Sequence, residues 1–252
     1  MSVIAGKKPI AEGKTKKIYS HRDPDKVILY FKNDITALDG LKHDVILGKG
    51  YINAYITKYL FELLEKAKIP TQLVDYIFPN IIIAKKIQML PIEVVCRNIA
   101  AGHLVKKLPF FKTGQHLKPP VIEFFYKSDE LHDPMVNEYH IQALSLASEK
   151  ETFQIKDYTL KANRVLKEFF TKRGLIFVDF KIEFGRLKKD ELIIGDELNG
   201  DSMRLWSSPE GGRAFDKDGY RSGESLEKVR ETYIDAFKVI TGEEPLKEGL
   251  ES

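Results

Sequence analysis

Residues 178–184 (VDFKIEF) alternate apolar and charged side chains without interruption. Alternation with a period of two is typical of a β-strand with one buried face, so this segment predicts a strand whose apolar side lies in the core. The charged residues Asp179, Lys181 and Glu183 then share the opposite face. That face is either simply solvated or part of a functional site, and this segment alone leaves both interpretations open.

The residues that follow predict a hairpin whose returning strand is 192–197 (LIIGDE). A four-residue turn at 188–191 would set Glu183 opposite Asp196, and a two-residue turn at 188–189 would set Lys181 opposite Asp196. A three-residue turn without a bulge would put Asp196 on the other face. In the first two registers two carboxylates share one face, where they repel unless a cation lies between them. Oxygen ligands suit Mg²⁺, so Glu183 and Asp196 are candidate metal ligands.

The rest of the chain mixes helical and strand periodicities, which indicates an α+β fold. We expect two lobes around a cleft, a smaller β-rich lobe at residues 1–90 and a larger lobe at 91–252. The segment 106–137 is expected to be loop with short strands. The expected strands are 14–20, 27–32, 72–77, 81–88 and 93–98, and the expected helices are 50–68, 158–172 and 226–240.

Two blocks place an arginine beside small residues. In 91–103 (PIEVVCRNIAAGH), Arg97 closes an apolar strand and Ala100, Ala101 and Gly102 follow it. Small residues let a ligand approach the backbone, and arginine binds phosphate or carboxylate with two parallel hydrogen bonds. A structural salt bridge to a nearby acid is an equally good explanation of Arg97. The block 195–206 (GDELNGDSMRLW) offers Arg204 in the same way, and we expect its tryptophan to belong to the core.

A third block, residues 12–16 (EGKTK), spans the start of the first expected strand. Its glycine and lysines could cover nucleotide phosphates, although most Gly-Lys pairs are surface turns. The block is not a Walker A loop, because GxxxxGK[ST] is absent.

Composition excludes several classes of protein. The chain has 252 residues and a formal net charge of only +3, which gives no argument for nucleic acid as a partner. Cys96 is the only cysteine, so no internal disulfide can form, and its apolar surroundings predict a buried thiol. The six histidines show no zinc-ligand spacing. The longest apolar stretches, such as 81–84, are too short to cross a membrane, and no signal peptide is evident, so we expect a cytoplasmic protein.

Taken together, these blocks resemble the SAICAR synthetase (phosphoribosylaminoimidazole-succinocarboxamide synthetase) family. The resemblance rests above all on 90–102 (LPIEVVCRNIAAG), 178–185 (VDFKIEFG) and 131–138 (LHDPMVNE), and extends from about residue 12 to 221. It implies a two-lobed α+β fold that resembles ATP-grasp enzymes and kinases, with ATP between the lobes. It also implies the condensation of carboxyaminoimidazole ribonucleotide (CAIR) with L-aspartate, driven by ATP and Mg²⁺, in a dimeric enzyme.

The resemblance assigns roles to residues of each block. Glu183 and Asp196 would hold Mg²⁺, and Asp179 and Lys181 would lie at the reacting end of CAIR. The remaining residues would bind substrates. ATP phosphates would contact Gly13, Lys14 and Lys16; adenine would meet the hinge from Lys86 to Leu90; the CAIR phosphate would meet Arg97 and Arg204; and Ser128 and Asp129 would lie near the nucleotide and aspartate.

Two positions depart from the family pattern. His103 stands where the family commonly has serine, so an imidazole N–H would have to replace any hydroxyl contact to the CAIR phosphate. Asn199 and Gly200 replace a common Ser-Pro pair, which leaves a looser turn before Arg204.

Two other functions share some of these features. A small-molecule kinase would use the same phosphate loop and metal carboxylates, but no HRD or DFG motif is present. An RNA-binding module would draw on the basic and aromatic residues of 106–127, and would need no Glu183.

Overall fold

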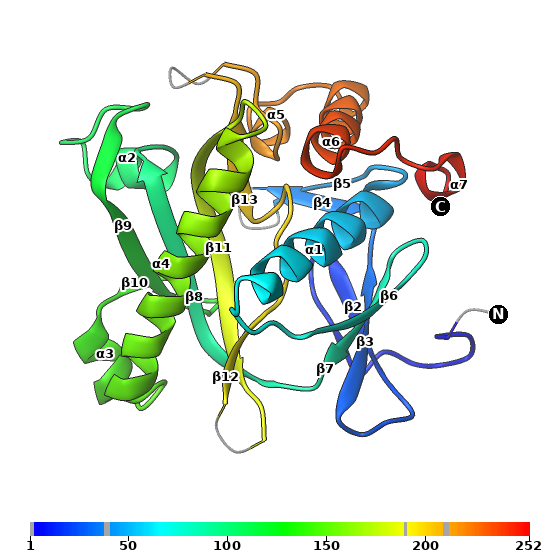
Figure 1. Cartoon of the computed structure of the whole chain (residues 1–252), viewed down its shortest axis with the longest axis horizontal. Coiled ribbons are helices and arrows are strands. Elements are labelled where there is room, and N and C mark those ends of the chain that lie inside the picture. The colour runs from blue at the N-terminus through cyan, green and yellow to red at the C-terminus, as the bar shows by residue number, and fades with distance from the viewer. Residues whose placement is uncertain (1–2, 38–40, 189–190, 209–211) are drawn as a thin grey trace.

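Two antiparallel sheets joined by a short connection organise the protein. The computed structural model describes residues 3–37, 41–188, 191–208 and 212–252. The first sheet has the order β1-β2-β3-β7-β6, and the second has the order β10-β9-β8-β11-β12, with β13 also paired to β11. The strands are β1 (Ala11–Glu12), β2 (Lys16–Ser20), β3 (Lys26–Phe31), β4 (Asp34–Ala37), β5 (Lys42–Val45), β6 (Leu73–Ile77), β7 (Ile81–Lys85), β8 (Gln88–Ile99), β9 (His116–Tyr126), β10 (Met135–Val136), β11 (Ile176–Arg186), β12 (Leu192–Gly195) and β13 (Met203–Trp206) (Figure 1).

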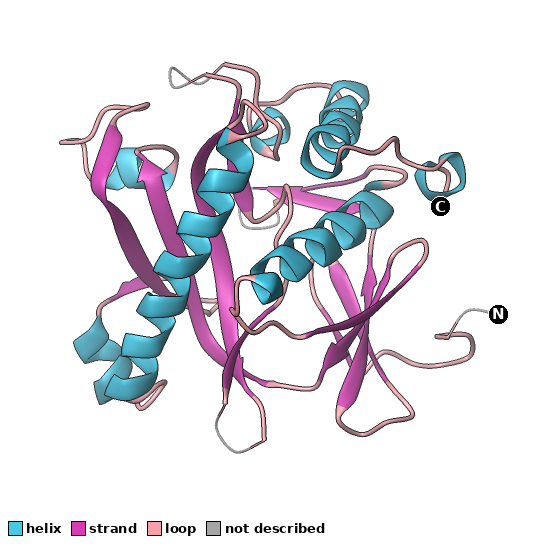
Figure 2. Cartoon of the chain, viewed as in Figure 1, coloured by secondary structure: helices cyan, strands magenta, loops and turns pink. Residues whose placement is uncertain are grey.

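Helices cover one side of each sheet, as Figure 2 shows. Helix α1 packs against strands β3, β6 and β7 of the first sheet, while α4 packs against β8 and β11 of the second. The helices are α1 (Lys49–Lys66), α2 (His103–Lys107), α3 (Glu138–Ala143), α4 (Glu149–Thr171), α5 (Asp218–Arg221), α6 (Leu226–Thr241) and α7 (Lys247–Leu250). The α+β class expected from the sequence is confirmed. The division into lobes at residue 90 stays a prediction.

Strand β12 ties the two sheets together. Its Ile194 N–H donates to the carbonyl of Pro70 at 3.0 Å, and its carbonyl accepts from Gln72 N–H at 2.9 Å. Gln72 also donates through Nε2 to the carbonyl of Asp196 at 2.9 Å. The end of β12 is therefore hydrogen-bonded both to its own sheet and to the residues that precede β6 of the first sheet.

The β11–β12 hairpin has neither of the two registers that would put Glu183 and Asp196 on one face. Glu183 pairs with Gly195 and Arg186 with Leu192, which corresponds to the three-residue turn. Both predicted registers are therefore wrong, and residues 189–190 of the expected turn lie outside the described residues. Gly195 makes room for a neighbouring side chain, because a Cβ at this position would lie 2.7 Å from Ile87 Cδ1.

Two other elements differ from expectation. Helix α4 begins at Glu149 rather than at residue 158, because Ser148 and Glu151 form a reciprocal capping box. Its buried side includes Leu166 and Phe170, whereas Leu160, which we expected on the apolar side, is 41% exposed. The segment expected to be loop with short strands instead contains β9, eleven residues long, paired with β8.

The core confirms two sequence interpretations. Cys96 is fully buried in β8, and burial raises the pKa of its thiol to about 12. Trp206 is also buried, in a small cluster with Ile99 and Val178. Within the described ranges, no helix has the length and apolar character needed to span a bilayer.

Candidate functional site

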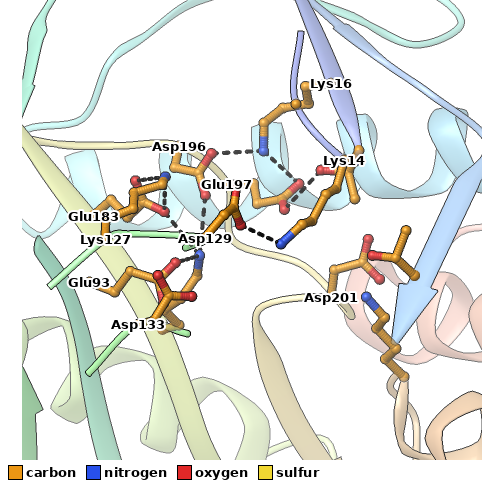
Figure 3. Close-up of a pocket in the computed structure, with 15 residues that line it drawn as sticks. Lys14, Lys16, Glu93, Lys127, Asp129, Asp133, Glu183, Asp196, Glu197 and Asp201 are labelled. Atoms are coloured by element: carbon orange, nitrogen blue, oxygen red, sulfur yellow. Dashed lines mark hydrogen bonds and ion pairs between the residues drawn. The ribbon is translucent and has the colours of Figure 1, made fainter. Parts of the chain in front are cut away.

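A cleft of about 380 Å³ lies between the β1–β2 turn and the face of the second sheet. Several residues expected to be functional share it. Its lining includes Gly13, Lys14, Lys16, Asp129, Lys181, Glu183 and Asp196 from the prediction, and Thr15, Thr36, Glu93, Lys127, Asp133, Glu197, Asp201 and Lys217 in addition. Figure 3 shows these side chains converging from several elements.

Lys16 of β2 crosses the cleft to two carboxylates that follow β12. Its Nζ lies 2.8 Å from Asp196 Oδ1 and 3.0 Å from Glu197 Oε2. Burial alone would lower the pKa of Lys16, but these two carboxylates outweigh it and raise the pKa. Burial would likewise raise the pKa of Asp196, but Lys16 and then Lys181 hold it below its ordinary value. Both side chains are therefore charged across the neutral pH range.

The conformation of Asp196 explains how its carboxylate reaches the cleft despite the unexpected register. Asp196 has a φ of 60°, in the left-handed region that non-glycine residues seldom occupy. It lies just beyond the last residue of β12, so the alternation of the strand no longer decides where its side chain points. The carboxylate reaches Lys16 as well as the charged face of β11, at 3.8 Å from Lys181 Nζ.

On β11 itself, Lys181 and Glu183 share the charged face as predicted. Lys181 Nζ lies 2.9 Å from Glu183 Oε1 and 2.9 Å from Glu93 Oε1, and Lys127 Nζ lies 2.7 Å from Glu183 Oε2. Burial, and then the neighbouring carboxylate of Asp196, raise the pKa of Glu183 above its ordinary value. This end of the cleft therefore holds closely spaced acids with lysines between them.

The acids at this end are suitable for a divalent cation bound together with phosphate. Glu183 and Asp196 both lie next to the ammonium group of Lys181, so the two carboxylates are close to each other. No cluster of three or more metal-binding side chains occurs in the described ranges of the chain. Mg²⁺ needs only one or two carboxylates when phosphate oxygens and water complete its shell, so the donor set fits it.

Arg97 and Arg204 meet at Asp179, and none of these three residues lines the cleft. Arg97 Nη1 lies 2.7 Å and Arg204 Nη1 2.8 Å from Asp179 Oδ2. Arg97 Nε also lies 2.5 Å from Glu123 Oε2, and Arg204 Nε lies 2.9 Å from Asp218 Oδ2. The sequence left a salt bridge as one explanation of Arg97, and the structure contains that salt bridge. Asp179 orients both guanidinium groups.

Gly102 and His103 border this arginine pair. A Cβ on Gly102, whose φ is 56°, would lie 2.7 Å from Arg204 Nη2. The small residue therefore makes room for a guanidinium group of the protein itself. Burial, and then Lys107 and Arg97, lower the pKa of His103. His103 is thus neutral at pH 7, with one ring N–H to donate.

The segment after β9 brings Asp129 over the cleft. Lys14 Nζ lies 2.7 Å from Asp129 Oδ1, and both side chains are well exposed. Ser128 is occupied within its own turn, because its N–H donates to Asp133 Oδ1 at 2.8 Å and its carbonyl accepts from Leu131 N–H at 3.1 Å. Of the two residues predicted here, only Asp129 lines the cleft.

The predicted adenine hinge connects β7 to β8, and neither Lys86 nor Leu90 lines the cleft of the acids and lysines. Lys86 lines a separate cavity of about 740 Å³ with Ile87, Gln88 and other residues. Its N–H donates to the carbonyl of Asp25 at 2.8 Å. Leu90 is buried in the core, so its side chain cannot contact a ligand from the cleft.

Comparison with known proteins decides the family. The sequence pattern of SAICAR synthetase matches residues 9–239. The chain belongs to the SAICAR synthetase family. Phosphoribosylaminoimidazole-succinocarboxamide synthase of Sulfurisphaera tokodaii is 48% identical over 92% of this chain and 97% of its own length. The protein of that name from Methanocaldococcus jannaschii is 47% identical over 90% of this chain and 93% of its own length.

Solved structures of SAICAR synthetases share the fold. One solved in complex with ADP is 41% identical, with a TM-score of 0.87 over 94% of this chain and 99% of its own. The phosphoribosylaminoimidazole-succinocarboxamide synthase of Ehrlichia chaffeensis is 38% identical, with a TM-score of 0.89 over 94% of this chain and all of its own. The family resemblance inferred from the sequence is confirmed, and neither the kinase nor the RNA-binding alternative is favoured.

Sequence reasoning missed several residues of this SAICAR synthetase cleft. Glu93 pairs with Glu183 across β8 and β11, and alternation along 93–98 could have found it. Glu197 and Asp201 lie in the block that contains Arg204, but no role was expected for their carboxylates. Lys217 lies between two aspartates and was not expected to line the cleft.

Proposed function

We propose that this protein joins CAIR to L-aspartate, converting ATP to ADP and phosphate and producing SAICAR in purine biosynthesis. The observation that carries the proposal is the ion pair of Lys16 with Asp196 across the cleft. It places the glycine- and lysine-containing turn directly over the acids of the second sheet. The cleft thus offers cations for phosphate and carboxylates for a metal in one volume, in a chain of the SAICAR synthetase family.

ATP would lie under the β1–β2 turn. Gly13 provides backbone close to the phosphates, and Lys14 and Lys16 provide positive charge. Lys16 is the better placed of the two, because its ammonium is buried and fixed, whereas Lys14 is half exposed. The adenine would extend toward the hinge, where the N–H of Lys86 is already donated to Asp25 and its carbonyl can accept from the adenine amino group.

Glu183 and Asp196 are the side chains that would hold Mg²⁺ in the cleft. When bound, the ion would neutralise charge on the phosphate chain and so favour transfer of the terminal phosphoryl group. Lys181 lies between the two carboxylates and is held charged by them, which suits it to orient the carboxylate of CAIR.

The CAIR phosphate would bind at Arg97 and Arg204, with the ring N–H of His103 as a further donor. Asp179 fixes both guanidinium groups before substrate arrives, so little side-chain entropy remains to be lost on binding. Asp179 therefore acts as a positioning residue, and Lys181 is the group that would meet the reacting carboxylate. Ser128 and Asp129 remain candidate contacts for nucleotide or aspartate.

Chemistry requires that the CAIR carboxylate be activated before the amine attacks. A carboxylate is a poor electrophile, because its oxygen is a poor leaving group. Transfer of the γ-phosphoryl group to that oxygen gives an acyl phosphate and ADP. The aspartate amine then attacks the carbonyl carbon, the carbon–oxygen bond to phosphate breaks, and phosphate leaves with the electron pair. Residues around a closed cleft would protect the acyl phosphate from water.

An omission assay tests the reaction. ADP release should require ATP, Mg²⁺, CAIR and aspartate together, with SAICAR and free phosphate as the other products. A phosphorylated stable product formed without aspartate would identify a kinase instead. RNA affinity with a steep salt dependence, and no effect of changing Glu183, would identify the RNA-binding alternative.

An isotope label tests the intermediate. With ¹⁸O in the CAIR carboxylate, one labelled oxygen should appear in the released phosphate. Unlabelled phosphate would rule out the acyl phosphate. A dimeric state and a cytoplasmic location also stay predictions, to be checked by sedimentation and by cell fractionation.

A further inference from the structure

A cluster of buried polar side chains centres on Asp201, which lines the cleft. In Figure 3, Asp201 lies on the opposite side of the pocket from Glu93 and Glu183. Lys49 Nζ lies 2.5 Å and Asn53 Nδ2 2.9 Å from Asp201 Oδ2, and the Tyr233 hydroxyl donates to Oδ1 at 2.5 Å. Both carboxylate oxygens are therefore engaged by partners from α1 and α6.

Lys217 lines the same cleft but has no such partner. Only 8% of the residue is exposed, and within the described ranges no carboxylate or hydrogen-bond acceptor is paired with its ammonium group. The other four lysines that line the cleft each have a carboxylate oxygen within 2.9 Å. They are Lys14, Lys16, Lys127 and Lys181.

The charges around Lys217 do not replace a partner. Burial lowers the pKa of Lys217, and Lys49 and Arg221 lower it further. Asp201 and Glu197 oppose this shift without cancelling it, since the carboxylate of Asp201 is already neutralised by Lys49. The side chain of Lys217 is mostly buried and its ammonium group borders the cleft without an anion, so this position gains from any ligand that brings a negative charge.

A second polar atom in the cluster also lacks a partner. In the part of the chain that the structure describes, Asn53 Oδ1 is the buried side-chain atom without a hydrogen bond. Asn53 belongs to the cluster through its bond to Asp201. Buried polar atoms are almost always paired, so the cluster is short of both an anion and a hydrogen-bond donor. Of Lys217 and Asn53, only Lys217 lines the cleft.

We infer that Lys217 binds the side-chain carboxylate of the amino-acid co-substrate, and so selects an acidic amino acid. This inference rests on the proposed function, because it assumes that aspartate enters this cleft. The amine of aspartate would lie toward Lys181, where the acyl phosphate forms, and a carboxylate would reach the Lys217 side of the cleft. The bound carboxylate would supply the anion that Lys217 lacks in the free protein.

Steady-state kinetics of Lys217→Met and Lys217→Arg test the inference. Loss of one charge-assisted contact should raise the KM for aspartate by about 10- to 100-fold in Lys217→Met, with kcat at saturating aspartate within a few fold of wild type. The KM values for CAIR and ATP should stay unchanged. Lys217→Arg keeps the charge and should recover most of the aspartate affinity. Lys172→Met removes an exposed lysine paired with Glu168 and serves as the control.

Thermal unfolding separates this role from a structural one. Because Lys217 has no partner in the free protein, Lys217→Met should unfold at the same or a higher temperature than wild type. A rise in the KM for CAIR instead of aspartate, a loss of kcat with unchanged KM, or a lower unfolding temperature would each overturn the inference. The wild-type omission assay decides the proposed function separately, because it involves no change at Lys217.

Discussion

Gly102 and Arg204 lie so close together that a methyl group on Gly102 would collide with the guanidinium group unless Arg204 moved. A Cβ on Gly102 would lie 2.7 Å from Arg204 Nη2 and 3.0 Å from its Cζ. Arg204 in turn lies 2.8 Å from Asp179, which also holds Arg97. The space left by Gly102 is therefore occupied by one member of the arginine pair that Asp179 holds together.

Gly102→Ala should displace Arg204 and weaken CAIR binding. We expect the KM for CAIR to rise about 10-fold or more, equivalent to about 1.4 kcal/mol, with the KM for ATP unchanged. Gly174→Ala is the matched control, because Gly174 also has a positive φ, of 72°, but no atom lies within 4 Å of its added Cβ. Both variants should lose stability, and only Gly102→Ala should lose CAIR affinity. Equal KM values for CAIR in the two variants would contradict the assignment.

Arg204→Ala should cost CAIR affinity directly. A lost arginine–phosphate contact is worth about 1.5–3 kcal/mol, so the KM for CAIR should rise at least 10-fold while that for ATP stays constant. Arg97→Ala should do the same, but it also leaves Glu123 and Asp179 without their buried cation and should lower stability by about 3–5 kcal/mol. Arg213→Ala, at an exposed arginine, is the control. A rise in the KM for ATP alone would reverse the proposed orientation of the cleft.

Glu183→Gln and Asp196→Asn should each lower activity at least about 100-fold at saturating Mg²⁺. Both changes keep the side-chain shape, so circular dichroism should show an intact fold. Glu168→Gln, on the exposed side of α4, is the control and should keep full activity. Near-normal turnover of both variants would remove these carboxylates from the metal site.

The ionisation of Glu151, at the start of α4, makes the stability of the protein depend on pH. It accepts from Arg186 Nε at 2.5 Å and Nη2 at 3.0 Å, and from Ser148 N–H at 2.8 Å. The Arg186 hydrogen bond is the main cause that lowers the pKa of Glu151 to about 2. A carboxyl whose pKa is lower in the folded protein stabilises it above the unfolded pKa of about 4.5, and that contribution disappears as the pH falls toward 2.

Glu151→Gln should therefore lower the free energy of unfolding by about 1 kcal/mol at neutral pH, within the range of helix-capping effects. The difference from wild type should shrink as the pH is lowered below about 4.5. Urea unfolding at two pH values measures it. Glu149→Gln removes another acid from the same helical turn and is the control. A difference that stays constant with pH would mean that the Arg186 ion pair contributes nothing.

The sequence predicted the α+β class and which charged side chains share one face of β11, because strand periodicity is a local property. Lys181 and Glu183 share a face for that reason. The hairpin register was predicted wrongly, because it depends on packing between distant residues, such as that of Gly195 against Ile87. Asp196 reached the expected cleft through a left-handed backbone conformation that no pattern of apolar residues encodes.

The partners of residues held by long-range contacts could not be predicted from the sequence either. Lys217 is informative only because Asp201 is already engaged by Lys49, 152 positions away in the chain. The same limit applies to Arg97, whose ion pairs with Glu123 and Asp179 come from two other strands. Motifs identify which side chains are unusual, whereas the fold determines which partners those side chains have.

The burial of Cys96 makes this protein convenient for labelling. Its thiol is fully buried in β8 and holds its proton, so native protein should not react with maleimides. A cysteine introduced at an exposed position such as 129 would then carry a single fluorophore or spin label without removal of the natural thiol. Reaction of the unmodified chain with the same reagent would report only the opening of the second sheet, and its rate would measure how often that sheet unfolds.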